Sequence, residues 1–187
     1  TYLILFLVIF AETGLVVTPF LPGDSLLFAV GSLSAMSNSV LNVHLIAVLL
    51  TIAAIIGDTV NYFIGKYFGQ RMIDSKKIKF INEAHIRKTT LFFQKHGGKT
   101  IIIGRFLPIV RTFAPFVAGM GCMDYRKFLF YNVMGGVIWI AVFIYSGFLF
   151  GNIPIIKRNF SLVVFVIIFI SFMPTLFELL IHRKTKL

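Results

Sequence analysis

Two segments decide the fold: Pro19-Phe20-Leu21-Pro22-Gly23-Asp24 and Arg105-Phe106-Leu107-Pro108-Ile109-Val110-Arg111. Each places proline and charge inside sequence that otherwise reads as membrane interior. A charged side chain near the bilayer centre costs roughly 2.5 to 3.5 kcal/mol on insertion scales, and four of them cost on the order of 10 kcal/mol unless they pair or meet water. The four are Glu12, Asp24, Arg105 and Arg111. We therefore predict that these side chains form the functional site.

The composition predicts an integral membrane protein. Of the 187 residues, 58% are hydrophobic and only 13% are charged, whereas a soluble domain carries about 25% charged residues. Residues 128–156 and 159–177 contain no Asp, Glu, Lys, Arg or His, and each run is long enough for a spanning helix of about 20 residues. The net charge of +11 lies in blocks beside the apolar runs, so we predict no nucleic-acid partner.

No pattern in the sequence indicates a metal centre or an enzyme. Cys122 is the only cysteine, and the four histidines have neither HExxH nor CxxC spacing. A lipid phosphatase would need a positioned nucleophile or base, such as an intramembrane His–Asp pair, and none is visible. We predict no catalytic residue, no metal and no cofactor.

Prolines divide the first part of the chain into a hairpin and a helix. Residues 2–17 and 25–36 form apolar arms of about 12 to 16 residues, which reach roughly 18 to 24 Å and are too short to cross a bilayer. We predict a re-entrant hairpin over 2–36 with Pro22 and Gly23 at its tip, followed by a transmembrane helix over 40–69.

The second part of the chain follows the same plan. We predict a re-entrant hairpin over 89–123 with Pro108 at its tip, a transmembrane helix over 128–151 and a C-terminal transmembrane helix over 160–181. Residues 66–99 carry nine Lys or Arg against two acidic residues. By the positive-inside rule this basic loop, with its connection 70–88, and the C-terminus are cytoplasmic.

Three short matches occur in the same order in both parts. Phe20-Leu21-Pro22 matches Phe106-Leu107-Pro108, Phe28-Ala29-Val30-Gly31 resembles Phe116-Val117-Ala118-Gly119, and Gly65 to Gly69 resembles Gly147 to Gly151. They indicate two repeats, 1–69 and 89–151. Because the charges put the two hairpins on opposite faces, the repeats are predicted to be inverted, with tips meeting near the midplane as in transporters. The predicted fold is thus a single all-α integral membrane domain over 1–187: two inverted repeats, each a re-entrant helical hairpin plus a transmembrane helix, and an additional C-terminal transmembrane helix.

The arginines are predicted to bind substrate. Arg105 and Arg111 flank a proline turn, and a guanidinium presents a planar fork that matches two phosphate oxygens. Glu12 and Asp24 are predicted to pair with them or to couple transport to protons, because protonation would free the arginines for an anionic headgroup. Two alternatives stay open: the four charges form only a structural ion network, or Asp24 is a helix N-cap.

Five further residues are candidates for the transport pathway: Asp58, Asn61, Tyr62, Asn132 and Trp139. For the first three, a solvated helix face is equally consistent with the sequence. The other two share a helix with Gly135 and Gly136, which more often permit tight packing than line a pathway. Residues 85–99 mix basic and apolar side chains, which indicates a helix at an anionic inner-leaflet surface.

The chain resembles the DedA family, also called the SNARE-associated or VTT-domain family. The matching residues include Phe10 to Gly14, Phe20 to Leu27, Gly57-Asp58, Asn61-Tyr62, Gly65 to Gly69, His96-Gly97, Gly104 to Pro108, Arg111, Ala118-Gly119, Met123, Phe128, Asn132, Gly135-Gly136 and Trp139. The resemblance implies a multi-pass protein of the bacterial inner (cytoplasmic) membrane. It also implies that some members translocate undecaprenyl phosphate, that others are connected with phosphatidylethanolamine or proton-dependent tolerance, and that eukaryotic relatives scramble phospholipids. By motif position the family's acidic pair falls on Glu12 and Asp24, and its arginine pair on Arg105 and Arg111.

Two functions remain open on the sequence alone. The first is a lipid transporter, or flippase, that moves undecaprenyl phosphate or a related anionic phospholipid, with membrane lipids and protons as partners. The alternative is a proton- or cation-coupled transporter of a small solute. The sequence leaves monomer and homodimer equally open.

Overall fold

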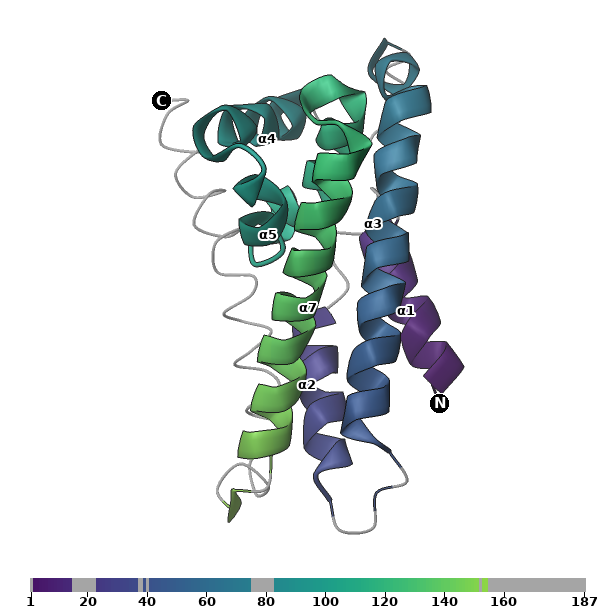
Figure 1. The fold of residues 1–187 in the computed structure, drawn as a ribbon, viewed down its shortest axis with the longest axis vertical. Helices are drawn as coiled ribbons and strands as arrows, with labels where there is room; N and C mark the ends of the chain where they lie inside the picture. Colours follow the sequence, from purple (N-terminus) through teal and green to yellow (C-terminus); the bar gives the residue numbers. More distant parts are fainter. Residues whose placement is uncertain are drawn as a thin grey trace, which may run out of the picture. The chain divides into compact units, whose positions relative to one another are not determined.

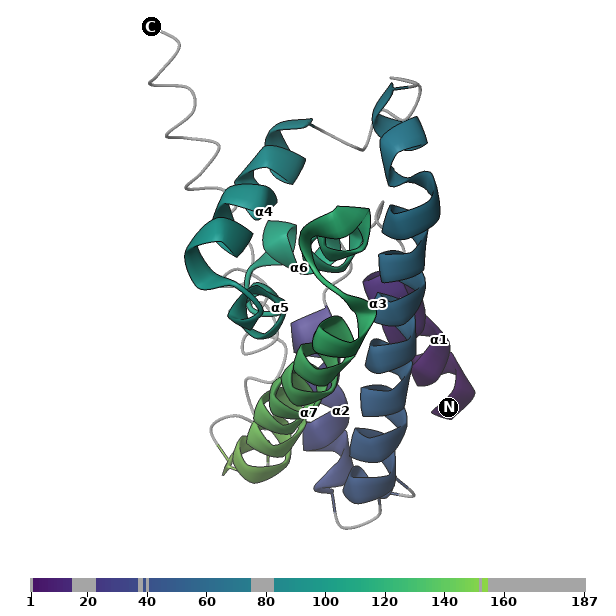
Figure 2. The same cartoon turned by 45° about the horizontal axis from the view of Figure 1, so that its top comes forward.

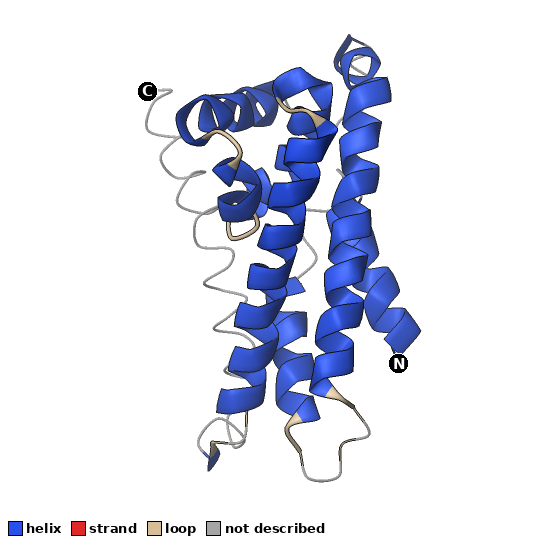
Figure 3. Cartoon of the chain, viewed as in Figure 1, coloured by secondary structure: helices blue, strands red, loops and turns tan. Residues whose placement is uncertain are grey.

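The computed structural model describes residues 2–14, 23–36, 39, 41–74, 83–151 and 153–154. Every regular element within these ranges is helical, and no strand occurs in them (Figure 3). The tip of the first predicted hairpin at Pro22, residues 75–82 of the basic connection and the predicted C-terminal helix 160–181 lie outside the described residues.

Three helices form the first part of the chain (Figure 1). α1 spans Tyr2–Gly14, α2 spans Gly23–Ser34 and α3 spans Val43–Asp74. The first two correspond to the predicted arms. The third continues five residues beyond the predicted end at 69, because Gln70 to Asp74 contain no glycine or proline that would stop a helix.

The second part contains more breaks than the sequence predicted. α4 spans Glu83–His96, α5 spans Lys99–Gly104, α6 spans Pro108–Val117, a π-helix η1 spans Ala118–Cys122 and α7 spans Tyr125–Phe150. The predicted hairpin range 89–123 thus contains the end of α4, all of α5 and α6, and η1. Gly97 has φ +56°, the left-handed geometry that ends a helix, and so it separates α4 from α5. Pro108 begins α6, where its missing N–H costs no hydrogen bond.

The two long helices are apolar enough to cross a membrane. The stretches Val43–Gly69 and Tyr125–Phe150 contain 27 and 26 residues, about 40 Å of helix each, against a hydrocarbon core of about 30 Å. Between Leu45 and Val60 of α3 the exposed side chains are apolar, with Val48 60% and Ile52 47% exposed, whereas Asp58 and Asn61 are buried. Buried polar side chains and exposed apolar side chains are expected for a helix surrounded by lipid.

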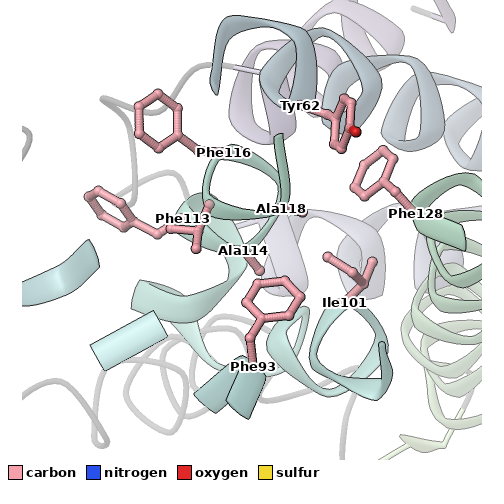
Figure 4. Packing of buried hydrophobic residues seen from close by; sticks show 9 residues of the cluster. Tyr62, Phe93, Ile101, Phe113, Ala114, Phe116, Ala118 and Phe128 are labelled. Carbon is pink, nitrogen blue, oxygen red and sulfur yellow. The ribbon is translucent and has the colours of Figure 1, made fainter. Parts of the chain in front are cut away.

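Contacts divide the chain into two compact units, of which the first comprises residues 1–21 and 48–139. In this unit α6 packs against α1, α4 and α5, and Figure 2 shows α4, α5 and α6 as neighbours. Its apolar core joins six elements through the following residues, drawn in Figure 4: Tyr62, Phe93, Ile101, Phe113, Ala114, Phe116, Val117, Ala118 and Phe128. Tyr62 stacks on Phe128 with ring centroids 4.6 Å apart and donates a hydrogen bond to the Met123 carbonyl oxygen at 2.9 Å.

Glycines bring helix backbones into contact within the first unit. A Cβ on Gly65 of α3 would lie 2.8 Å from the carbonyl carbon of Phe116, and a Cβ on Gly119 would lie 2.9 Å from that of Tyr62. Real Cβ atoms essentially never come so close, so no larger residue fits at either position without a backbone shift. These two glycines therefore fix α3 against the segment formed by α6 and η1.

The second unit, residues 22–47 and 140–187, contains a corresponding contact. A Cβ on Gly147 of α7 would lie 2.9 Å from the carbonyl carbon of Phe28, and a Cβ on Gly31 of α2 would lie 2.9 Å from that of Ile144. Gly65 and Gly147 thus each hold a long helix close to one of the segments that we predicted as hairpin arms. In both units the arm comes from the other predicted repeat.

Candidate functional site: a buried charge cluster

Arg105 lies in the turn between α5 and α6 and reaches two neighbouring helices. Its Nη2 donates to the Asp58 carboxylate of α3 and, at 2.5 Å, to the Asn132 Oδ1 of α7. Arg105 and Asp58 are each 3% exposed, and Asn132 is fully buried. Asn132 Nδ2 in turn donates to the Ile55 carbonyl oxygen at 3.1 Å, which orients the amide so that its oxygen faces the arginine.

The other two guanidinium nitrogens of Arg105 make no such hydrogen bond. Nε and Nη1 are buried and have no hydrogen-bond partner among the described residues. Leaving a buried donor of a charged group without an acceptor is costly. Nη2 thus makes the hydrogen bonds of this guanidinium, and the donors on Nε and Nη1 stay unsatisfied.

Arg111, in the second turn of α6, forms a second ion pair. Its Nη2 lies 3.2 Å from the Glu12 Oε1 of α1, and the Arg111 and Glu12 side chains are 8% and 4% exposed. The ring of Trp139 lies next to both arginines, with its centroid 4.1 Å from the Arg111 Cζ and 5.8 Å from the Arg105 Cζ. Contact with one aromatic ring stabilises two cations that would otherwise repel each other.

Asn61 fixes the backbone that carries the second pair. Its Nδ2 donates to the Thr13 carbonyl oxygen at 3.2 Å and to the Thr112 carbonyl oxygen at 2.9 Å. Thr13 follows Glu12 and Thr112 follows Arg111. One buried amide of α3 therefore ties together the two chain segments that bear the Glu12–Arg111 pair.

Glycine makes room for the Arg105 side chain. A Cβ on Gly135 of α7 would lie 3.1 Å from the Arg105 Nε and 3.2 Å from the Ile102 Cα. A Cβ on Gly136 would lie 3.3 Å from the Ile55 Cγ1. Both glycines permit tight packing, as predicted, and the space at Gly135 is also what admits the arginine.

The structure brings seven predicted site residues into one cluster of the first unit: Glu12, Asp58, Asn61, Arg105, Arg111, Asn132 and Trp139. The alternative that Asp58 lies on a solvated helix face is wrong, because it is buried and bound to Arg105. The sequence did not identify this pairing. The available signal was the spacing of Asp58 and Asn61, which places two polar side chains on one face of an apolar helix.

The other predicted site residues belong to the following elements. Tyr62 belongs to the aromatic core shown in Figure 4. Asp24 lies in the first turn of α2, in the second unit, where a carboxylate is favoured by the helix dipole. Gly23 begins α2, and Pro108 begins α6.

Comparison with known proteins identifies the family. The model of the VTT domain matches residues 21–149. Protein DedA of Escherichia coli (strain K12) is 52% identical over 183 residues, which cover 98% of this chain and 84% of that protein. The chain belongs to the DedA family. No solved structure matches it.

Other DedA-family relatives indicate the location. An uncharacterized membrane protein of Mycobacterium tuberculosis (strain ATCC 25618 / H37Rv) is 38% identical over 91% of this chain and 74% of its own length. Inner membrane protein YqjA of Escherichia coli (strain K12) is 33% identical over 84% of this chain and 70% of its own length. Together with its two long apolar helices, these relatives identify this DedA-family chain as a membrane protein.

Proposed function

We propose that this protein is a lipid transporter that moves undecaprenyl phosphate or a related anionic phospholipid across the bacterial inner membrane. The observation that supports it most directly is the partial coordination of Arg105. Its Nη2 contacts Asp58 and Asn132, while its buried Nε and Nη1 have no partner among the described residues. A phosphate oxygen accepting from these donors would satisfy them with strong, charge-assisted hydrogen bonds.

The charge balance of the cluster favours coupling to protons. Two arginines pair with two carboxylates, Glu12 and Asp58, so the charges of these four side chains cancel when all are ionised. A buried phosphate would add negative charge, and a proton taken up by either carboxylate would restore the balance. Proton uptake and headgroup binding would then occur together, and the acyl chains would stay in the lipid.

Inverted repeats would supply the alternating access that such a cycle needs. In this proposal two re-entrant hairpins enter from opposite faces, residues 66–99 and the C-terminus are cytoplasmic, and the headgroup crosses at the level of the charge cluster. The matching glycine contacts in the two units support a duplicated plan. The protein acts as a carrier, so the lipid would leave chemically unchanged.

The proposal is tested in liposomes that contain the purified protein and fluorescent undecaprenyl phosphate. Transbilayer movement is followed for wild type, Arg105→Lys, Arg105→Gln and the exposed control Arg87→Lys. We expect both Arg105 variants to lose at least about tenfold in rate, because Lys keeps the charge but not the fork. The control should match wild type. Equal movement in all four proteins, or none above empty liposomes in wild type, contradicts the proposal.

Transport of a small solute with protons or cations is the second candidate, and the two buried carboxylates favour it. The variant Glu12→Gln separates the two functions. For a proton-coupled lipid transporter, lipid movement by wild type depends on pH and the variant flattens that dependence. For a solute transporter, a pH gradient drives solute uptake while lipid movement stays at the level of empty liposomes.

A further inference from the structure

A cavity in the first unit lies apart from the charge cluster. Its volume is about 860 Å³, within the range of small-molecule sites. Its walls come from the end of α4, the turn after η1 and the first turns of α7. Within the described residues both glycines with positive φ, Gly97 and Gly121, line it, so the two turns that only glycine readily adopts shape this cavity.

The residues that line the cavity include a charged and polar group and an aromatic group. Arg126 and Lys127 supply two exposed cations, Gln94 adds a neutral hydrogen-bonding group, and Asp124 contributes one opposing negative charge. Phe93 and Phe130 supply apolar surface, and Phe130 is 63% exposed. A net positive wall beside an exposed aromatic wall fits a molecule with an anionic head and an apolar tail.

We propose that this cavity binds the phosphate headgroup of an anionic lipid at the inner leaflet, with the first part of its acyl or prenyl chain against Phe130. The amphipathic sequence of α4 supports this placement, because its basic and aromatic side chains suit an anionic membrane surface. That the site loads lipid for transport rests on the proposed function, whereas the binding itself does not require transport.

Cys122 provides a direct readout, because the only cysteine of the chain lines the cavity and is exposed. The protein in detergent is treated with a fluorescent maleimide at increasing concentrations of dioctanoyl phosphatidic acid. Dioctanoyl phosphatidylcholine and inorganic phosphate serve as separate arms. We expect phosphatidic acid to slow labelling in a saturable way, and the other two compounds to leave it unchanged.

Three variants test which surface holds the lipid. Arg126→Gln/Lys127→Gln should raise the half-protecting concentration about tenfold or more, since each surface cation adds to the attraction of an anionic lipid. Lys66→Gln/Arg87→Gln removes the same charge outside the cavity and should behave as wild type. Phe130→Ser should weaken protection without any change in charge.

Several results would overturn this site. They are no protection in wild type, equal protection by phosphatidylcholine or by inorganic phosphate, and an equal loss in the Lys66/Arg87 control. Arg105→Gln distinguishes the site from the transport proposal, because it should stop lipid movement while Cys122 protection persists. Protection without any transport by wild type would contradict the proposed function and leave the binding site standing.

Discussion

At the scale of single residues, the cluster depends on how buried charges are neutralised. Asp58 and Glu12 each face one arginine, Trp139 lies against both arginines, and the amides of Asn61 and Asn132 bind backbone carbonyl oxygens. A buried ion pair contributes little net stability, but removing one partner leaves an uncompensated charge. Replacing one member of an ion pair should therefore lower the free energy of unfolding more than replacing both members together.

The Asp58–Arg105 pair provides the first prediction. Asp58→Ala should lower the free energy of unfolding by about 3 to 5 kcal/mol, because it leaves the Arg105 guanidinium buried without its carboxylate. Unfolding of the purified protein in detergent micelles, followed by circular dichroism during titration with a denaturing detergent, measures the change.

A double-mutant cycle is the control for this prediction. Asp58→Ala/Arg105→Met removes both charges and should be less destabilised than the sum of the two single variants, by more than about 0.5 kcal/mol. Additive effects would contradict a direct energetic coupling between the two side chains.

The sequence identifies most members of this cluster, including a pair between Glu12 and an arginine, but not the partner of Arg105. Charges inside apolar runs reveal Glu12, Arg105 and Arg111, since their cost near the bilayer centre requires an explanation. The partner of Arg105 depends on which helix faces the turn after α5, and that is set by packing at Gly135 and Gly136. Asp24 matches the family pattern equally well, so neither charge nor motif could have selected Asp58.

At the scale of elements, close backbone contacts hold the long helices against shorter ones. Gly65 and Gly119 permit this in the first unit, and Gly31 and Gly147 permit it in the second. Small residues at helix contacts are the usual basis of packing in membranes, where lipid is as apolar as the side chains. These glycines are thus retained for space despite the helix propensity that alanine would add.

The second prediction concerns these contacts. Gly65→Ala and Gly147→Ala should each destabilise the protein by about 1 to 3 kcal/mol, since the added methyl would overlap a carbonyl group of the facing helix. Overpacking outweighs the helix propensity gained, which is about 1 kcal/mol. The measurement is the same titration in micelles.

Gly14→Ala is the matched control, because the nearest atoms to its Cβ lie at 3.4 Å, an ordinary contact distance. It should change the free energy of unfolding by less than about 0.5 kcal/mol. A similar loss in Gly14→Ala, or no loss in the two test variants, would show that the close contacts do not limit stability.

The sequence predicted the long helices better than the breaks between the short ones. The long apolar runs gave α3 and α7, and the prolines gave the break before α6. The division of α4 from α5 depends on the left-handed φ of Gly97, and a histidine followed by a glycine pair is a sequence typical of such a helix end. The π-helix η1 follows Pro115, which removes a backbone donor from α6, and its length has no signature in the composition.

At the scale of the whole molecule, the distribution of charge sets the expected orientation in the membrane. By the positive-inside rule, the nine basic residues of 66–99 predict a cytoplasmic position for that segment, and in the proposed orientation the turn after η1 lies on the same side. The segment between α2 and α3 is then external. Both sides can be tested with thiol labelling, because Cys122 is the only cysteine and is exposed.

The third prediction is that a membrane-impermeant maleimide labels Cys122 in inside-out vesicles and not in right-side-out vesicles. Partial burial raises the pKa of the Cys122 thiol, so its thiolate fraction at neutral pH is below that of a free cysteine. The labelling rate should therefore keep rising as the pH increases past about 8.5. The control Cys122→Ser/Ser39→Cys moves the thiol to the segment between α2 and α3, and the labelling should then reverse. Labelling of both thiols from the same side would contradict the proposal that the two hairpins enter from opposite faces. Alternating access would then lack its physical basis.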